Sequence, residues 1–156
     1  MRTRHPEDFL RWDPVRTTMV KRGRTAVAYE LAHLRRRPDW RRRWRPALRE
    51  STLGRPRPVP RLPWTSGTTI HHAYHLCRFE EATGVAVERF PCIVEFGGGY
   101  GGFCRLLHGL GFAGRYVIFD LPVVTALQRF YLRALGIPVA VPGNPPGEPG
   151  RGVITV

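Results

Sequence analysis

The eleven residues CIVEFGGGYGG, from Cys92 to Gly102, constrain the fold of this 156-residue chain more than any other stretch. A short apolar run leads directly into five glycines, and a stretch of helical character follows. Glycine lets the chain turn sharply and removes Cβ atoms that would keep a ligand away from the backbone. A strand, a glycine loop and a helix in this order are typical of nucleotide cradles, in which helix N-terminal amides face the bound molecule.

The sequence from Glu88 onward alternates short apolar runs with amphipathic stretches, which is typical of a parallel α/β unit. The second helix of this region has Pro122 in its first turn and Gly136 just past its end, as helices favour. The expected elements are strands over residues 92–96, 115–119 and 137–141, helices over 101–110 and 122–135, and a last apolar stub over 153–156.

The first part of the chain differs in charge. Residues 1–63 hold 18 basic and 6 acidic side chains, a net charge of +12 out of +13 for the whole chain. We expect helices over residues 24–37 and 68–84, and the proline-rich stretch 51–67 between them reads as an extended connection, neither helix nor central strand. We therefore divide the chain into a basic, mainly helical N-terminal extension with its connection, 1–63, and an α/β domain, 64–156.

The arginine-rich part has two interpretations. Basic blocks are usually solvated faces, and two tryptophans four residues apart, Trp40 and Trp44, usually anchor a helix to a core. Alternatively, the arginines bind phosphates and the tryptophans stack on bases, which would make this part a nucleic-acid-binding module.

Other chemistry-bearing residues are sparse. Cys77, Cys92 and Cys104 form no CxxC pair and read as reduced, mostly buried thiols. His71 and His75 have a spacing that can bind a metal, but no third ligand stands out, so we expect a packed or surface pair and no metal. Neither a signal peptide nor a membrane span is indicated, which predicts a cytoplasmic protein without membrane partners.

The glycine loop fits two fingerprints. Gly97, Gly99 and Gly102 match GxGxxG, the dinucleotide motif, with Asp120 about where a ribose-binding acid is expected. This reading gives an NAD-dependent oxidoreductase as one alternative.

The second fingerprint, acid-x-G-x-G-x-G, uses Glu95 with Gly97, Gly99 and Gly101. A carboxylate here would repel the pyrophosphate of a dinucleotide but attract the sulfonium and ammonium groups of S-adenosylmethionine. Glu95 therefore favours a methyl donor. Asp120 suits either ligand, because a carboxylate at a strand end accepts hydrogen bonds from ribose hydroxyls, although it could also cap the following helix.

The stretches VEFGGGYGG and RYVIFDLPVVTALQRFYL together resemble S-adenosylmethionine-dependent methyltransferases, and among them the bacterial sugar O-methyltransferases, over about residues 90–138. The resemblance implies a Rossmann-like class I methyltransferase fold, S-adenosylmethionine as cofactor and a sugar or other small-molecule acceptor. It implies that Asp120 holds the ribose and that Tyr100 and Leu121 line the pocket, while the methionine moiety lies on Glu95, Gly97, Gly99 and Gly101.

Proteins of this family have a seven-stranded sheet, and the chain corresponds only to the first part of it. We expect a fold truncated after three or four strands, either as a fragment of a longer protein or as a shortened copy, active or inactive. Such a sheet would have an open edge through which copies could self-associate. The catalytic base is left unassigned, since no residue is placed over the methyl group. The alternative functions are nucleic-acid binding and RNA methylation, both using the arginine-rich part.

Overall fold

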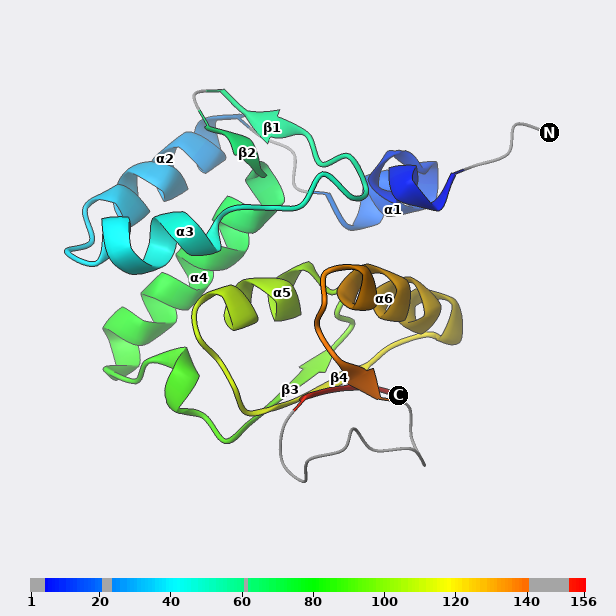
Figure 1. Cartoon of the computed structure of the whole chain (residues 1–156). Coiled ribbons are helices and arrows are strands. Elements are labelled where there is room, and N and C mark those ends of the chain that lie inside the picture. The colour runs from blue at the N-terminus through cyan, green and yellow to red at the C-terminus, as the bar shows by residue number, and fades with distance from the viewer. Residues whose placement is uncertain (1–4, 21–23, 61, 141–151) are drawn as a thin grey trace. The chain divides into compact units, whose positions relative to one another are not determined.

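The computed structural model describes residues 5–20, 24–60, 62–140 and 152–156. The chain divides into two compact units, Met1–Ala82 and Thr83–Val156 (Figure 1). The division therefore lies later than the boundary that the sequence suggested after residue 63, because the long helix that follows the proline-rich stretch belongs to the first unit.

Unit 1 is helical apart from one small hairpin. Its elements are η1 (Pro6–Arg11), α1 (Asp13–Thr18), α2 (Arg24–Arg35), the π-helical turn η2 (Trp40–Trp44), α3 (Arg45–Ala47), β1 (Pro58–Val59), β2 (Leu62–Ser66) and α4 (Gly67–Thr83). The expected helices correspond to α2 and α4. The proline-rich stretch is more ordered than an extended connection, because β1 and β2 pair as antiparallel strands. A two-stranded sheet has only edge strands, where proline is tolerated.

Partly buried hydrogen bonds between ionisable side chains join α4 to the preceding helices, in agreement with its place in unit 1. The guanidinium of Arg43 donates two hydrogen bonds to the Glu80 carboxylate, at 2.7 and 2.6 Å. Nδ1 of His71 lies 2.7 Å from a carboxylate oxygen of Glu30, a residue that is only 5% exposed. Both acids lie on covered surface, so α4 is bound to α2 and η2 by specific polar contacts as well as by apolar packing.

Trp44 is part of the core of unit 1. Its side chain is fully buried, and its indole N–H donates to the carboxylate of Asp39 at 3.1 Å. The expectation that this tryptophan anchors a helix is confirmed, and stacking of Trp44 on a base is not possible in this structure.

Unit 2 contains the expected α/β pattern. Its elements are η3 (Val87–Arg89), β3 (Cys92–Phe96), α5 (Gly102–Gly109), β4 (Arg115–Phe119), α6 (Pro122–Ala134), β5 (Val139–Ala140) and β6 (Gly152–Thr155). The first two predicted strands and both helices are confirmed to within two residues at each end. The third strand is shorter than predicted over its described residues, and the final stub is a strand.

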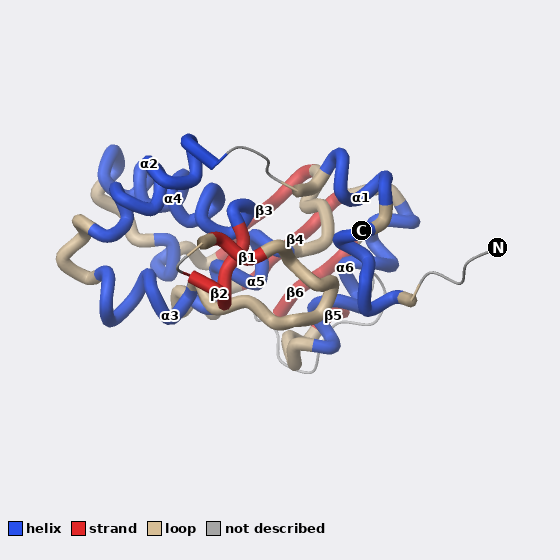
Figure 2. The backbone as a smooth tube through the Cα atoms, turned by 90° about the horizontal axis from the view of Figure 1, so that it is seen from above, coloured by secondary structure: helices blue, strands red, loops and turns tan. Residues whose placement is uncertain are grey.

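The four strands of unit 2 form one parallel sheet in the order β3, β4, β6, β5 (Figure 2). The register pairs Phe96 with Phe119 at the carboxyl ends of β3 and β4. On its other side β4 pairs with β6, which separates it from β5. The chain thus has the mixed α/β architecture with a parallel sheet that the sequence indicated, and this architecture is compatible with the Rossmann-like class.

Helices α5 and α6 cover one face of this sheet (Figures 1 and 2). Tyr116, Ile118 and Val153 point to that face and are fully buried. Arg129 fastens α6 to β6, since its guanidinium donates to the hydroxyl and the carbonyl oxygen of Thr155. The covered face is therefore the core of the unit.

Large apolar side chains of β3 and β4 remain exposed, with Phe96 79% and Val94 52% exposed. The rings of Phe96 and Phe119 stack on each other with centroids 5.2 Å apart.

No helix in the described part of the chain combines the length and the apolar character needed to cross a membrane.

Candidate functional site

The glycine loop and Asp120 are neighbours because of the strand register. Both follow the carboxyl ends of adjacent parallel strands, and the N–H of Gly97 donates to the carbonyl of Phe119 at 2.9 Å, which extends the ladder by one step. In parallel α/β sheets, ligands bind outside the carboxyl ends of the strands. The structure therefore brings the two predicted halves of the site together.

Three glycines of the loop have backbone angles that other residues rarely adopt. The φ angles of Gly97, Gly99 and Gly101 are 72°, 55° and 89°. A Cβ atom in this region is crowded by the backbone, so glycine is required for local reasons. These are the glycines of the acid-x-G-x-G-x-G spacing, whereas Gly102, the last glycine of GxGxxG, is the first residue of α5 and has no positive φ.

The other two glycines of the loop are required by packing. A Cβ atom on Gly98 would lie 2.6 Å from a methyl group of Ile118 and 2.9 Å from a carboxylate oxygen of Glu95. A Cβ atom on Gly102 would lie 2.6 Å from the ring of Tyr100. All five glycines thus have a structural reason, and the loop lies closely over the end of β3.

Glu95 lies beneath the loop on the covered face of the sheet. The hydroxyl of Tyr116 donates to its Oε2 at 2.7 Å, while no hydrogen bond from the described residues reaches Oε1. Burial raises the pKa of Glu95 above its ordinary value, the hydrogen bond from Tyr116 opposes this, and the charge of Asp120 adds to it. Glu95 is therefore a half-buried acid that a nearby cation would stabilise in its charged form.

Asp120 uses both oxygens within the fold. Oδ1 accepts from the N–H of Leu121 at 2.8 Å, and Oδ2 accepts from the side-chain amide of Gln128 at 2.9 Å. Leu121 is the residue before the first turn of α6, so the contact orients the carboxylate rather than satisfying the amides inside the helix. Each carboxylate oxygen has two lone pairs, so each keeps one for a ribose hydroxyl.

Gln128 is a site residue that the sequence did not indicate. It is fully buried in α6, and its Nε2 donates to both the carbonyl of Gly99 and the carboxylate of Asp120, at 2.9 Å each. Its own carbonyl oxygen has no partner among the described residues. Burying an amide whose oxygen has no hydrogen-bond partner costs folding free energy. A polar residue at this buried position therefore indicates a specific role, and the two hydrogen bonds of Gln128 indicate that it holds the loop and the acid at a fixed separation. On the sequence it is one polar position of an amphipathic helix, so it carried no signal.

Tyr100 and Leu121, expected to line the pocket, have different surroundings. Tyr100 is only 4% exposed, and its ring packs edge-on against Tyr131 with centroids 5.1 Å apart. Its ring is therefore packed inside unit 2. Leu121 is 68% exposed, so its side chain is accessible to a ligand. Their roles toward a ligand stay predictions.

Unit 2 offers no evident general base at this site within its described residues. Its imidazole, His108, lies near the end of α5, six residues beyond Gly102, which corresponds to about 9 Å along a helix axis. Burial lowers the pKa of His108, opposed by a backbone hydrogen bond at Phe112. His108 thus lies at the end of α5 that is remote from the glycine loop.

In unit 1, His71 and His75 form a packed pair, as expected. Their rings meet edge to face with centroids 4.4 Å apart, and His71 is bound to Glu30. The thiols also follow the expectation for the most part, since Cys77 and Cys104 are buried and Cys92 is exposed.

Comparisons of the chain with protein-family models, with curated proteins and with solved structures found no match.

Proposed function

We propose that unit 2 binds S-adenosylmethionine at the glycine loop and Asp120, and that the protein is an S-adenosylmethionine-dependent methyltransferase. The observation that carries this proposal is the coincidence of positive φ angles at Gly97, Gly99 and Gly101 with two acids, Glu95 before the loop and Asp120 after the neighbouring strand. The loop offers bare backbone, Glu95 offers negative charge, and Asp120 offers acceptors for two hydroxyls.

The charge of the site supports a cationic ligand over a dinucleotide. Burial raises the pKa of Glu95, and the charge of Asp120 raises it further. A pyrophosphate would add further negative charge between two carboxylates, whereas the sulfonium and ammonium groups of S-adenosylmethionine would reduce their repulsion.

The acceptor class follows from the resemblance to sugar O-methyltransferases, and we propose a sugar hydroxyl. Transfer to oxygen requires the hydroxyl in line with the sulfonium methyl and a base that takes its proton. The residues of the loop would position the donor, and the base remains unassigned.

Calorimetric titration with S-adenosylhomocysteine tests cofactor binding. We expect one site per chain, and Asp120→Ala should weaken binding roughly 10- to 100-fold, because hydrogen bonds to a charged acceptor contribute about 1.5–3 kcal/mol. Glu88→Ala, which changes an exposed acid of the same unit, is the matched control and should bind like the wild type. No heat with the wild type, or equal affinity of the Asp120→Ala variant, would refute the proposal. Quenching of NADH fluorescence by the protein, without binding of S-adenosylhomocysteine, would favour the NAD-dependent oxidoreductase.

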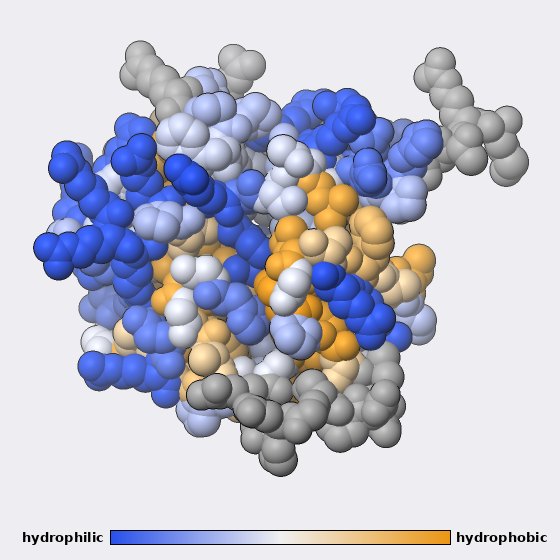
Figure 3. Space-filling model, viewed as in Figure 1, coloured by the Kyte–Doolittle hydropathy of each residue, from blue (hydrophilic) through white to orange (hydrophobic). Residues whose placement is uncertain are grey.

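Nucleic-acid binding is a second candidate, favoured by one observation in unit 1. Arginines of α2 and of the turn after it are exposed and form a hydrophilic surface (Figure 3), namely Arg35, Arg36, Arg41 and Arg42. An exposed cluster of guanidinium groups suits phosphates. Because Trp44 is buried, such binding would depend on the phosphate backbone rather than on base stacking by that residue.

A further inference from the structure

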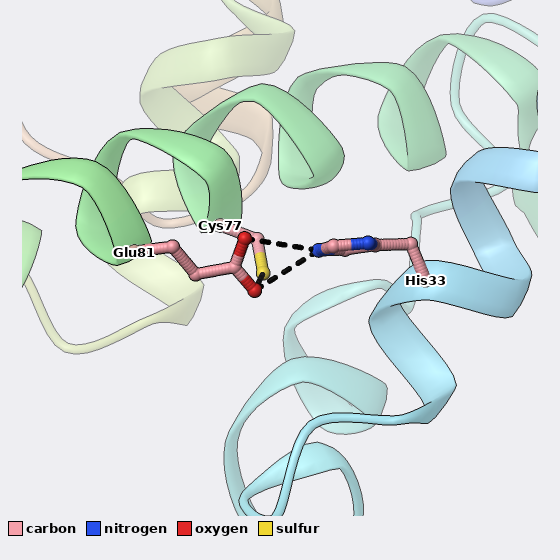
Figure 4. A group of neighbouring side chains, drawn as sticks. All are labelled: His33, Cys77 and Glu81. Atoms are coloured by element: carbon pink, nitrogen blue, oxygen red, sulfur yellow. Dashed lines mark hydrogen bonds and ion pairs between the residues drawn. The ribbon is translucent and has the colours of Figure 1, made fainter.

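Three side chains with different donor atoms converge in unit 1 (Figure 4). His33 projects from α2, and Cys77 and Glu81 lie one turn apart on α4, so that they share a helix face. Their donor atoms all lie within 4.8 Å of one another. Among the residues that the structure describes, this is the one group of three or more such side chains close enough to share an ion.

The distances suit a small tetrahedral ion. Nε2 of His33 lies 3.0 and 3.1 Å from the two carboxylate oxygens of Glu81, and Sγ of Cys77 lies 3.6 Å from Oε1. Bonds of about 2.0–2.3 Å from zinc to nitrogen, oxygen and sulfur place tetrahedral ligands about 3.3–3.6 Å apart. The two contacts to Glu81 are thus near the spacing of tetrahedral ligands, and Nε2 of His33 and Sγ of Cys77 lie within 4.8 Å of each other.

We propose that His33, Cys77 and Glu81 bind one zinc ion, with a water molecule at the fourth position. Sulfur and imidazole nitrogen are donors for zinc and similar transition metals, whereas magnesium and calcium take oxygen ligands. Three protein ligands with an open position are a known zinc arrangement. The site lies wholly in unit 1 and is independent of the proposed cofactor site.

Binding of zinc releases one proton, that of the Cys77 thiol. Cys77 is a buried free cysteine, and a buried thiol is neutral in the absence of an ion, whereas zinc binds the thiolate. When zinc binds, the S–H bond breaks, the Zn–S bond forms and the proton leaves to solvent. The resulting thiolate and the Glu81 carboxylate together balance the two charges of the ion.

Two arginines contact the carboxylate of Glu81, and each has an alternative to this contact. Arg37 donates to Oε1 of Glu81 at 3.3 Å, and Arg78 donates to Oε2 at 3.1 Å. Arg37 has a second acid, Asp39, at 3.6 Å, and the side chain of Arg78 is 58% exposed. If Glu81 binds the ion through one oxygen, the other oxygen keeps one arginine as an outer-sphere partner, which is a common way to orient a ligand.

Cobalt(II) is the probe for the test, because it replaces zinc and shows a thiolate charge-transfer band when sulfur is a ligand. The full chain, without a histidine tag and freed of metal by a chelator, should bind one equivalent and show this band. Glu81→Gln and Cys77→Ser should each lower the affinity by more than the roughly 10- to 100-fold that loss of an outer-sphere partner costs. Cys77→Ser should also abolish the band.

Cys92→Ser is the matched control, because it removes an exposed thiol in β3 and should leave the band and the affinity unchanged. Thermal unfolding of each metal-free variant shows whether it folds. If the Cys77→Ser variant does not fold, the milder Glu81→Gln substitution still tests the proposal. Binding without the charge-transfer band, a band that is lost in Cys92→Ser, or no binding by the wild type would overturn the proposal.

Discussion

The side-chain amide of Gln128 lies 2.9 Å from a carboxylate oxygen of Asp120, and the same nitrogen lies 2.9 Å from the carbonyl oxygen of Gly99. One buried donor thus connects the loop after β3 to the acid after β4. Neither strand alone determines the separation of loop and acid. The strand register brings the loop and the acid to the same edge of the sheet, and Gln128, one helix further along the chain, joins them directly.

Replacing Gln128 with methionine should therefore damage the candidate site more than its size change suggests. We expect a loss of about 1–3 kcal/mol in the free energy of unfolding, because two acceptors lose their donor, and a weaker affinity for S-adenosylhomocysteine. Chemical denaturation and calorimetry measure the two effects. Thr125→Val is the control on the same helix, since the buried hydroxyl of Thr125 has no partner among the described residues and its loss should be neutral or stabilising. Wild-type affinity in the Gln128→Met variant would remove Gln128 from the site.

The contact of Gln128 with Asp120 could not be predicted from the sequence, whereas other parts of the site could. The strands and helices of unit 2 could be predicted because apolar periodicity and glycine punctuation are local signals. Glu95, the glycines and Asp120 could be proposed as one site because parallel strands place their carboxyl ends at one edge. Gln128 could not, because its role depends on how α6 packs over the loop.

The same limit applies to unit 1. His33 and Glu81 are 48 residues apart and meet only because α2 packs against α4. The spacing of Cys77 and Glu81 on one helix was readable, but two ligands without a third are a weak signal. The order of the strands was also hidden, because nothing local indicates that β6 lies between β4 and β5.

The buried acid beneath the loop predicts a pH-dependent stability. Because the pKa of Glu95 is raised in the folded state, mainly by burial, its favourable contribution is complete below the unfolded pKa of about 4.3 and is lost as pH rises through the folded value. The wild type should therefore lose stability relative to Glu95→Gln as the pH rises above about 4. Tyr116→Phe should enlarge the loss, since Tyr116 stabilises the charged carboxylate. Denaturation series at several pH values measure this, and a difference that does not change with pH would contradict it.

The exposed arginines of unit 1 predict salt-dependent binding if the protein takes nucleic acid. Changing Arg41 and Arg42 to glutamine should reduce the slope of log affinity against log salt by about 1.4 for single-stranded RNA, since each phosphate contact contributes about 0.7. Fluorescence anisotropy with a labelled oligonucleotide measures the slope. Arg89→Gln, in η3 of unit 2, is the control and should not change it. An unchanged slope in the double variant would mean that this surface does not bind phosphates.

A glycine of the loop can be required for its backbone conformation or because a ligand lies against it. Comparing Gly97→Ala with Gly84→Ala distinguishes these two reasons. Gly97 and Gly84 have similar positive φ angles, 72° and 70°, and a Cβ atom at either position would meet nothing within 4 Å. Both alanine variants should lose about 1–2 kcal/mol of stability from the strained backbone alone. Only Gly97→Ala should also weaken binding of S-adenosylhomocysteine, because its new methyl group would occupy the space over the loop. Equal affinity of the two variants would show that no ligand lies against the backbone at Gly97, and the proposed cofactor site would then lack its central feature.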